Sequence, residues 1–496
     1  MEFPHEISTF IPELGVNDTK PSFENAIAKY AYNYFCEMLK IPHGSGNEKA
    51  LSDYLMAFAE RHGLDAVQDE SLNVLIKKPG SKWRENEPPV ILQAHMDMVC
   101  EKNGDVNHDF LKDPIALIIN GDWVKAAGTT LGADNAGGLS LVMAVLASNL
   151  SRPPIEAIIT TGEEATMGGA CGFDASRLFG KRFINLDSET EGVFTVSSAG
   201  ATDIYVSITV EYETAPEGFA AYKLMARGLK GGHSGIDINR GRANANVLAA
   251  RLLSRLEKVR AACIDGGSQK NAIPRECTVV ISFDMSDFAQ IKTVVEKMER
   301  ELRAEYPFDE GLTITLQQTE AYQNVMSFDS QQTVISAILL TPDGVQSMSP
   351  NIEGLVQTSN NIGVVKTDGT TVRLTNFFRS SDIAGRDLGI KNLKRLMEAL
   401  GANVEVKDQS PPWEYKENSP LRDTMTAAFK EFYGKEPKTA AIHAGLECAV
   451  FAEKIPDGDF ISIGMDITGA HSPDEKMGIS SFDRTGGYLV RVLEKL

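Results

Sequence analysis

The sequence predicts an α/β fold, with a mixed, mostly parallel sheet in one domain and an α+β domain inserted into that domain. In the first part of the chain, short apolar strands alternate with helical segments, and polar residues stand where the strands end. After about Ala201 the strands instead alternate apolar and polar residues, which is typical of a sheet with one buried face. A chain of 496 residues is long enough for two domains with full cores.

The elements of the first domain follow from apolar periodicity. Its strands are short apolar runs, and its helices carry apolar residues three and four positions apart. In chain order we expect helices over 21–39 and 50–61, strands over 73–76 and 90–94, a helix opened by 132–138 and ending at 147, strands over 155–160 and 182–186, a helix over 421–433, a strand over 460–463 and a C-terminal helix.

The inserted domain contains two segments with the same pattern. Residues 278–316 and 371–406 each predict a strand, a helix and a strand, which suggests a duplicated unit. A long amphipathic helix is expected over 242–260. The stretch Ser410-Pro411-Pro412-Trp413 ends the insertion. We therefore assign 1–201 and 410–496 to the first domain, and 202–409 to an inserted lid domain.

Composition and charge narrow the class of protein. The net charge of −19 argues against nucleic acid and anionic membranes as partners, since both require a basic surface. No apolar run approaches the roughly 20 residues needed to cross a bilayer, and the N-terminus lacks the pattern of a signal peptide. The six cysteines have no paired spacing and are interpreted as reduced thiols. We expect a soluble cytoplasmic protein.

One strand, 90–94, ends in His95, and Asp97 follows two residues later. Residues two apart on an extended backbone face the same side, so both side chains lie at the strand end, where open α/β sheets build their sites. A neutral imidazole is a good zinc ligand, and a nearby carboxylate can orient it. A purely structural His–Asp pair has the same pattern, so the rest of the chain must decide between them.

Further acids and histidines end apolar strands or lie in glycine-rich loops. Buried carboxylates are costly unless paired or bound to metal, so several of them at strand ends indicate a cation site. Two histidines and three or four carboxylates suit a pair of zinc-type ions with a bridging carboxylate, and one glutamate remains to activate water. The histidines disfavour magnesium or calcium. The candidates are His95, Asp97, Asp134, Glu163, Glu164, Asp187, His233, His443, Glu447 and His471.

These residues carry a resemblance over nearly the whole chain. The sequence resembles the co-catalytic zinc metallopeptidases of the carnosinase and glutamate-carboxypeptidase family, and most of all their aminoacyl-histidine dipeptidase branch. The resemblance implies a zinc-peptidase-like first domain with an inserted lid. The matching motifs are His95-Met96-Asp97, Gly132-Ala133-Asp134-Asn135, Gly162-Glu163-Glu164, Asp187, Gly231-Gly232-His233-Ser234-Gly235, Asn271-Ala272-Ile273-Pro274, His443-Ala444-Gly445-Leu446-Glu447 and Gly469-Ala470-His471-Ser472.

The resemblance implies two divalent metal ions, zinc in the first place and cobalt or manganese as alternatives. One ion is held by His95 and Asp187, the other by Glu164 and His471, and Asp134 bridges them. Two further catalytic roles follow: Asp97 holds the His95 ring, and Glu163 acts as the general base. The family also has a cis peptide bond after the bridging aspartate, here Asp134-Asn135.

The resemblance places substrate contacts in or next to the lid. His233 stabilises the oxyanion, Asn271 and Arg379 bind the backbone and the free carboxylate of the substrate, and Gly445 lets the chain approach it. His443 either contacts substrate or pairs with Glu447 four residues later on a helix face. Bland alternatives remain, in which His233 is a plain turn residue and Arg379 a solvated charge.

The implied function is hydrolysis of dipeptides with a free C-terminus, Xaa-His among them, by a metal-activated water molecule. The lid closes over short peptides, and a homodimer is expected, in which His233 acts in its own or in the partner's site. Two alternatives are an amide deacylase or tripeptidase of the same fold, and a non-catalytic peptide- or metal-binding relative. The retained Glu163 and ligand set argue against the last of these.

Overall fold

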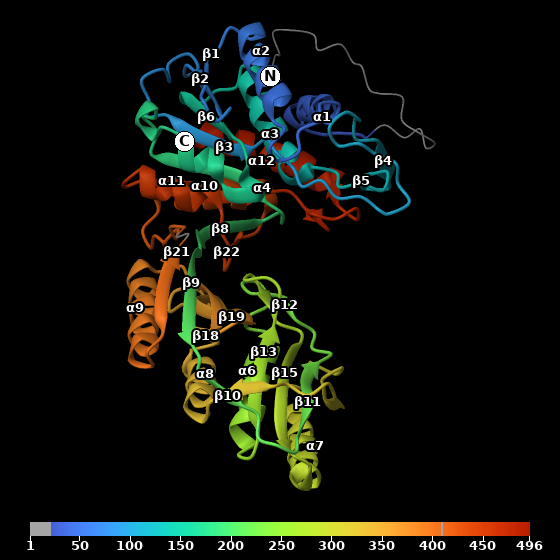
Figure 1. The fold of residues 1–496 in the computed structure, drawn as a ribbon. Helices are drawn as coiled ribbons and strands as arrows, with labels where there is room; N and C mark the ends of the chain where they lie inside the picture. Colours follow the sequence, from blue (N-terminus) through green and yellow to red (C-terminus); the bar gives the residue numbers. More distant parts are fainter. Residues whose placement is uncertain (1–20, 408–409) are drawn as a thin grey trace. The chain divides into compact units, whose positions relative to one another are not determined.

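The computed structural model describes residues 21–407 and 410–496 (Figure 1). The described residues divide into two compact units. Unit 1 contains those up to Ser197 together with Tyr415–Ala440 and Glu447–Leu496, and unit 2 contains those of Ser198–Glu414 and Ala441–Leu446. The predicted domain boundaries stay a prediction. The one at 409/410 adjoins residues 408 and 409, and the predicted first domain begins with residues 1–20, all of which lie outside the described residues.

Unit 1 alternates helices and strands along most of its length. Its elements are α1 (Ala26–Met38), α2 (Lys49–Arg61), β1 (Asp65–Gln68), β2 (Val74–Lys78), β3 (Val90–His95), β4 (Leu117–Asn120), β5 (Trp123–Ala126), α3 (Ala133–Ala147), β6 (Ile155–Thr160), α4 (Glu163–Thr166), α5 (Gly168–Gly172), β7 (Arg182–Ser188), β8 (Val193–Ser198), α10 (Pro420–Tyr433), β22 (Lys438–Ile442), α11 (Glu447–Lys454), β23 (Asp459–Gly464), β24 (Ile467–Thr468), β25 (Lys476–Gly478) and α12 (Ile479–Lys495). Strands β8 and β22 each run from unit 1 into unit 2.

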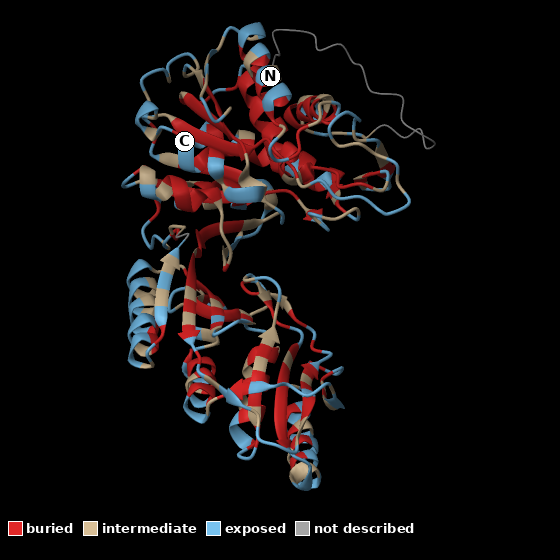
Figure 2. Cartoon of the chain, in the orientation of Figure 1, coloured by how far each residue is buried: buried red, intermediate tan, exposed pale blue. Residues whose placement is uncertain are grey.

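The main sheet of unit 1 has eight strands in the order β1-β2-β6-β3-β7-β23-β8-β22. Its central pairs, β6–β3, β3–β7 and β7–β23, are parallel, whereas β1–β2 and β2–β6 are antiparallel. Every residue of β3, β6 and β23 is buried, so both faces of the sheet are covered (Figure 2). The predicted fold class, a mixed sheet with a parallel centre and an additional antiparallel α+β domain, is confirmed.

Helix α3 explains the glycine-rich run at its start. Almost all of α3 is buried, and it packs against α1, β3 and β7 (Figure 1). A Cβ atom on Gly138 would lie 2.1 Å from the carbonyl oxygen of Leu186, so only glycine allows this close approach of helix and strand. The approach brings the start of α3 next to the end of β7, where Asp187 lies.

Unit 2 is α+β. Its elements are β9 (Gly200–Thr209), β10 (Tyr212–Thr214), β11 (Phe219–Arg227), β12 (Gly232–His233), α6 (Ala245–Arg255), β13 (Arg260–Gly266), β14 (Ala272–Ile273), β15 (Cys277–Asp284), α7 (Phe288–Glu305), β16 (Thr313–Gln318), β17 (Asn324–Met326), α8 (Phe328–Leu340), β18 (Gly344–Met348), β19 (Val356–Asp368), β20 (Thr371–Ser380), α9 (Ile383–Ala399) and β21 (Asn403–Lys407). A nine-stranded sheet runs in the order β16-β11-β15-β13-β19-β20-β9-β21, with β18 paired to β19.

The two predicted strand–helix–strand segments are confirmed as β15-α7-β16 and β20-α9-β21. In both, the two strands do not pair with each other but flank an earlier strand, which is β11 in the first and β9 in the second. One core of buried apolar side chains from the strands and from α6, α7 and α8 lies beneath this sheet. The duplication therefore extends to the way the strands are paired.

One predicted helix of the insertion is too long. Helix α6 begins after Asn244, whose side chain accepts a hydrogen bond from the backbone N–H of Asn246, and it ends at Arg255. Residues 256–259 lie between the two elements, and Arg260, the last residue of the predicted range, begins strand β13, which pairs with β15. A short apolar run fits either period, and here pairing with a neighbouring strand decides the outcome. Within the described residues, no helix is long and apolar enough to span a membrane.

Candidate active site

The strand-end residues predicted from the sequence lie together in unit 1. His95 is the last residue of β3, and its Nδ1 lies 3.0 Å from the carbonyl oxygen of Asp97 and 3.5 Å from the Oδ1 of that residue. The buried Asp97 carboxylate accepts hydrogen bonds from Ser45 Oγ at 2.7 Å and from the backbone N–H of Glu163 at 3.0 Å. Asp97 thus restrains both the His95 ring and the loop that follows β6.

Asp134 lies between two histidines. Its Oδ1 is 3.1 Å from Nε2 of His95, and its Oδ2 is 3.3 Å from Nε2 of His471. The other neighbours complete two groups, since Asp187 Oδ1 is 3.2 Å from His95 Nε2 and Glu164 Oε2 is 2.9 Å from His471 Nε2. The carboxylate of Asp134 therefore faces both groups with different oxygen atoms.

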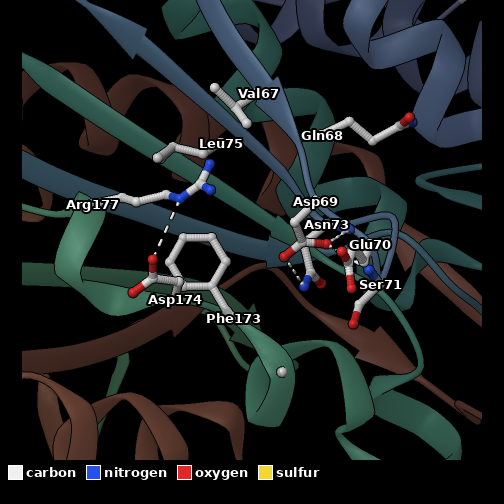
Figure 3. Close-up of a pocket in the computed structure, with 11 residues that line it drawn as sticks. Val67, Gln68, Asp69, Glu70, Ser71, Asn73, Leu75, Phe173, Asp174 and Arg177 are labelled. Atoms are coloured by element: carbon white, nitrogen blue, oxygen red, sulfur yellow. Dashed lines mark hydrogen bonds and ion pairs between the residues drawn. The ribbon is translucent and has the colours of Figure 1, made fainter.

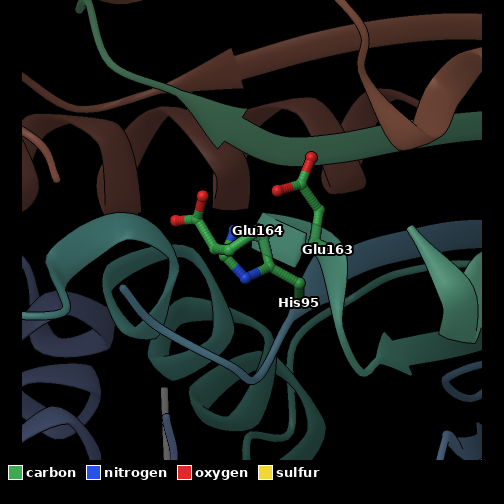
Figure 4. Close-up of side chains that lie close together, drawn as sticks. All are labelled: His95, Glu163 and Glu164. Atoms are coloured by element: carbon green, nitrogen blue, oxygen red, sulfur yellow. The ribbon is translucent and has the colours of Figure 1, made fainter. Parts of the chain in front are cut away.

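Three overlapping sets of side chains bring their ligand atoms within 4.8 Å of one another. The sets are His95 with Asp134 and Asp187, Asp134 with Glu164 and His471, and His95 with Glu163 and Glu164. Figure 4 shows the last of them, in which the two adjacent glutamates point in different directions from the start of α4. The chain therefore assembles candidate ligand sets for more than one metal ion.

The side chains of this site have the chemistry needed to bind cations. Oδ1 of Asp187 and Oε1 of Glu164 are buried and accept no directed hydrogen bond. Nε2 of His95 faces carboxylate oxygens of Asp134 and Asp187 at once, and a single N–H cannot donate to both. Buried carboxylates in this arrangement need compensating positive charge, which is what divalent ions supply.

Two pKa shifts show the same excess of negative charge. Burial lowers the pKa of His95, but Asp187 and Asp134 outweigh it and raise the pKa well above its ordinary value. Hydrogen bonds to Asp134 and Glu164 raise the pKa of His471 to about 11. In the absence of metal, protons on these imidazoles occupy the places between the carboxylates, so metal binding and protonation compete for the same nitrogens.

Glu163 differs from its neighbour Glu164. Burial raises the pKa of Glu163 well above its ordinary value, His95 lowers it, and the charges of Asp187 and Glu447 raise it further. Among the described residues, no ion pair joins a carboxylate oxygen of Glu163 to a histidine, whereas Glu164 pairs with His471. The two adjacent acids thus have separate surroundings among the described residues, as one ligand and one base require.

The bond Asp134-Asn135 is cis, as the resemblance implies. The loop before it is held by Glu475, a buried residue that the sequence analysis missed. Its carboxylate accepts hydrogen bonds from the backbone N–H groups of Leu131 at 2.7 Å, Gly132 at 2.9 Å and Asp134 at 3.2 Å. Because Glu475 follows His471 by four residues, it joins the two loops that carry these candidate ligands. Its position four residues after His471 was the signal in the sequence that could have identified Glu475.

Other predicted residues gather in unit 2. Arg379 is the last residue but one of β20, and its Nη2 lies 3.5 Å from Nε2 of His233. Its guanidinium lies 4.5 Å above the ring of Phe377. His443 Nε2 lies 2.7 Å from Ser359 Oγ. The pairing of His443 with Glu447 on one helix face is wrong, because α11 begins only at Glu447 and the two residues have different partners.

Asn271 lies in the turn between β13 and β14, directly before β14. Its carbonyl oxygen accepts a hydrogen bond from the backbone N–H of Ser234 at 2.9 Å. The buried Asn361 side chain donates to the carbonyls on either side of it, those of Lys270 at 3.0 Å and Ala272 at 2.9 Å. The backbone around Asn271 is therefore fixed while its side chain is left for other partners. Gly445 lies in the segment Ala441–Leu446 of the same unit.

Arg379, His233 and His443 form a cluster in unit 2, which we call the unit 2 cluster. Its charge is positive, opposite to that of the carboxylates in unit 1. Arg379 is buried, its Nε has no hydrogen-bond partner, and among the described residues no carboxylate pairs with it. Burial lowers the pKa of Arg379 to about 10, and burial together with Arg379 lowers the pKa of His443 to about 3. The same two causes lower the pKa of His233. A buried guanidinium among neutral imidazoles has the charge and the donors to bind an anion such as a carboxylate.

A surface pocket of about 350 Å³ also lies in unit 1, beside β1, β2 and α5, and holds none of the predicted residues (Figure 3). One residue lining it, Asn73, accepts a hydrogen bond from the backbone N–H of Thr161 at 3.1 Å and donates to the carbonyl of Gly169 at 3.0 Å. Asn73 thus helps to hold the loop that follows β6 in place.

Comparison with known proteins adds three findings. The model of a family described as Peptidase family M20/M25/M40 matches residues 91–495. The cytosol non-specific dipeptidase of Escherichia coli is 38% identical over 470 residues, which cover 94% of this chain and 97% of that protein. The crystal structure of aminoacylhistidine dipeptidase from Vibrio alginolyticus matches with a TM-score of 0.87 and 37% identity, over 95% of this chain and 97% of that one.

A more distant structure shares the fold alone. The aminopeptidase PepT from Bacillus cereus matches with a TM-score of 0.56 at 15% identity, over 94% of this chain and 98% of that one. The arrangement of the whole chain is therefore common to relatives that differ widely in sequence.

Proposed function

The chain belongs to the peptidase family M20/M25/M40, and we propose that it is a metal-dependent dipeptidase. The observation that carries the proposal is Asp134, whose two oxygens face the two histidine groups of unit 1. Its similarity over nearly its full length to a cytosol non-specific dipeptidase and to an aminoacylhistidine dipeptidase supports dipeptides, Xaa-His among them, as substrates. By the same similarity we place its action in the cytosol.

We assign the ligands of two divalent ions, with zinc first and cobalt or manganese as alternatives. His95 and Asp187 would hold one ion, Glu164 and His471 would hold the other, and Asp134 would contribute to both. When bound, the ions polarise the scissile carbonyl and lower the pKa of a water molecule. Asp97 keeps the Nδ1 proton of His95 directed at its own carbonyl, so that Nε2 is free to act as a ligand.

Glu163 moves the proton. It takes a proton from the attacking water and gives it to the amine that leaves, so its carboxylate is unchanged at the end of the cycle. The hydrogen bond from its backbone N–H to Asp97 holds the start of α4 in place while this happens. Peptide hydrolysis then consumes one water and releases two amino acids.

The unit 2 cluster supplies anion-binding groups. Arg379 binds the free carboxylate of the dipeptide through its planar fork, and the neutral His233 donates a hydrogen bond to the developing oxyanion. Asn271 binds the substrate backbone, Gly445 allows close approach, and His443 lines the same cluster through Ser359. Selection of short substrates follows if the bound carboxylate must lie one residue from the scissile bond.

The test is hydrolysis of a small panel by metal-free protein and by protein with zinc, cobalt or manganese restored. The panel contains Ala-His, β-alanyl-His, a Gly-Gly-type dipeptide, a tripeptide and an N-acetyl amino acid. We expect metal-dependent cleavage of the dipeptides. Cleavage of the acetyl amino acid alone would make the protein a deacylase, and cleavage of the tripeptide alone a tripeptidase. Binding of metal without any cleavage would favour a non-catalytic relative.

The homodimer is also proposed and not yet tested. Light scattering of the purified protein over a range of concentrations measures the mass directly. A single species of twice the 54.0 kDa chain mass is the expected result.

A further inference from the structure

A row of polar side chains crosses the fully buried centre of the unit 1 sheet. Gln93 of β3 is the register partner of Asn185 of β7, which is the partner of Ser462 of β23. The side chains are hydrogen-bonded in the same order: Asn185 Nδ2 donates to Gln93 Oε1 at 2.5 Å, and Ser462 Oγ donates to Asn185 Oδ1. All three residues are 0% exposed. We call this row the polar ladder.

The polar ladder lies directly before the candidate metal ligands. His95 follows Gln93 by two residues, and Asp187 follows Asn185 by two residues, so the ligand side chains and the ladder share one face of the sheet. Asn185 also contacts the ligand-bearing segment, because its Oδ1 accepts a hydrogen bond from the backbone N–H of Asp187 at 3.2 Å. Any shift of the ladder would therefore move the ends of β3 and β7.

Glu447 ends the ladder. Its Oε2 accepts hydrogen bonds from Gln93 Nε2 at 2.5 Å and from Thr160 Oγ at 2.7 Å. Its Oε1 has no hydrogen-bond donor, the residue is 0% exposed, and among the described residues no basic side chain pairs with it. A buried carboxylate without a cationic partner is strongly disfavoured unless nearby positive charge compensates it.

Among the described residues, the positive charge that acts on Glu447 is that of His95, one of the candidate metal ligands. The charge of Glu447 acts on Asp187, Glu163 and Cys448, and His95 acts on Glu447 in turn. All lie at one end of the sheet. A purely structural polar layer would need only neutral groups, since a neutral acceptor at this place could also accept from Gln93 Nε2 and Thr160 Oγ. The charge at the end of the ladder needs another explanation.

We propose that Glu447 is a positioning residue for metal binding, which orients His95 and Asp187 through the polar ladder and adds negative charge beneath them. This inference rests on the metal site of the proposed function and deepens it. Glu447 is not assigned as a ligand, because it belongs to none of the three candidate ligand sets. Residues that orient metal ligands in this way commonly change metal affinity by about 10- to 100-fold when replaced.

The test is Glu447→Gln in the full chain. Glutamine keeps an oxygen that can accept from Gln93 and Thr160, so this change removes the charge and preserves the shape. The probe is Co²⁺, followed by its visible absorption, with Zn²⁺ affinity measured by competition against a chelator. We expect affinity for at least one ion to fall about 10- to 100-fold and the Co²⁺ spectrum to change.

Glu156→Gln is the matched control. Glu156 is a buried carboxylate at the other end of β6, where it accepts hydrogen bonds from the backbone N–H groups of Phe179 at 3.0 Å and Gly180 at 2.9 Å and pairs with Lys77. Its replacement should lower stability and leave metal affinity and the Co²⁺ spectrum unchanged. An equal loss of affinity in both variants would mean that any damage to the sheet weakens metal binding, and would overturn the proposal.

The other outcomes are also decisive. Wild-type protein that binds no Co²⁺ or Zn²⁺ would refute the proposed function itself. Wild-type binding with unchanged affinity and spectrum in Glu447→Gln would refute the role of Glu447 alone. If Glu447→Gln does not fold, Thr160→Val decides, since it removes one of the two donors to Glu447 and keeps the side-chain shape. It should lower metal affinity in the same direction by a smaller factor, and unchanged affinity would refute the proposal.

Discussion

The two units contain clusters of opposite charge. In unit 1, Asp134, Glu164 and Asp187 surround His95 and His471, and buried carboxylate oxygens lack donors. In unit 2, the buried Arg379 lies beside the neutral His233, and no acid within residues 21–407 and 410–496 pairs with it. The first cluster has an excess of negative groups and the second an excess of positive charge. The same residue type therefore serves opposite purposes, since histidine is drawn toward protonation in one cluster and held neutral in the other.

This contrast shows how to interpret unsatisfied buried groups. A fold that stabilised only itself would pair these charges internally, because unpaired buried charges lower stability. Leaving acids together in one unit and a guanidinium without a carboxylate partner among the described residues of the other costs stability, and we propose that it prepares binding of a metal pair and of a carboxylate. Each of the following variants changes one of the two clusters and leaves the other intact.

The largest effect is expected for Glu163→Gln. This change removes the proposed base and keeps the size of the side chain, so kcat for a dipeptide should fall by about 10²- to 10⁴-fold. Metal content, measured by elemental analysis, should stay at the wild-type level, because Glu163 is not assigned as a ligand. Asp134→Asn is the comparison variant and should lose both metal and activity. Near-normal turnover in Glu163→Gln would remove this residue from the mechanism.

Arg379→Met should act on the substrate and not on the metals. Loss of a buried partner of a carboxylate commonly costs about 2 kcal/mol or more, which corresponds to a fall in kcat/KM of about 30-fold or greater. We expect most of this fall in kcat/KM to come from a higher KM, and we expect metal affinity to stay unchanged. Arg379→Lys, which keeps the charge and loses the fork, should recover only part of the activity. Equal kcat/KM in wild type and Arg379→Met would show Arg379 to be structural.

Glu475→Gln tests the support of the bridging aspartate. The carboxylate accepts three backbone N–H groups before and at Asp134, and an amide presents one N–H₂ group where an acceptor is needed. Metal affinity should fall about tenfold, at the lower end of the effect seen for residues that orient ligands. Calorimetric titration of the metal-free protein measures it. Glu436→Gln, at an exposed acid of unit 1, provides the control and should bind metal normally.

The smallest effect concerns pH and unit 2. Burial and Arg379 lower the pKa of His443 to about 3, so the unfolded chain binds a proton at this residue near pH 6.5 and the folded chain does not. His443 therefore contributes stability above pH 6.5 that is lost as the pH falls from 6.5 toward 3. As the pH falls from 6.5 toward 3, the Tm of His443→Gln should therefore fall by less than the Tm of wild type. Parallel Tm curves for the two proteins would contradict a buried neutral His443.

Much of the fold followed from periodicity. The apolar runs of β3, β6 and β7 and the repeated strand–helix–strand pattern of the insertion were readable because both depend on neighbours in sequence. The end of α6 could not be predicted in this way, because the strand that begins at Arg260 forms only through pairing with β15. The return of the segment Ala441–Leu446 to unit 2 likewise has no local signal.

The sequence by itself determined which residues could form the site. Histidines and acids at the ends of apolar strands, and the motifs around Asp134, Glu163 and His471, are local patterns, since strand direction fixes where a strand-end side chain must lie. Only the tertiary structure decided how they are used. Which oxygen of Asp134 faces which histidine, and why Glu475 and Glu447 are buried, depend on contacts between segments hundreds of residues apart. Packing of distant strands and loops sets those contacts, and no short stretch of sequence contains them.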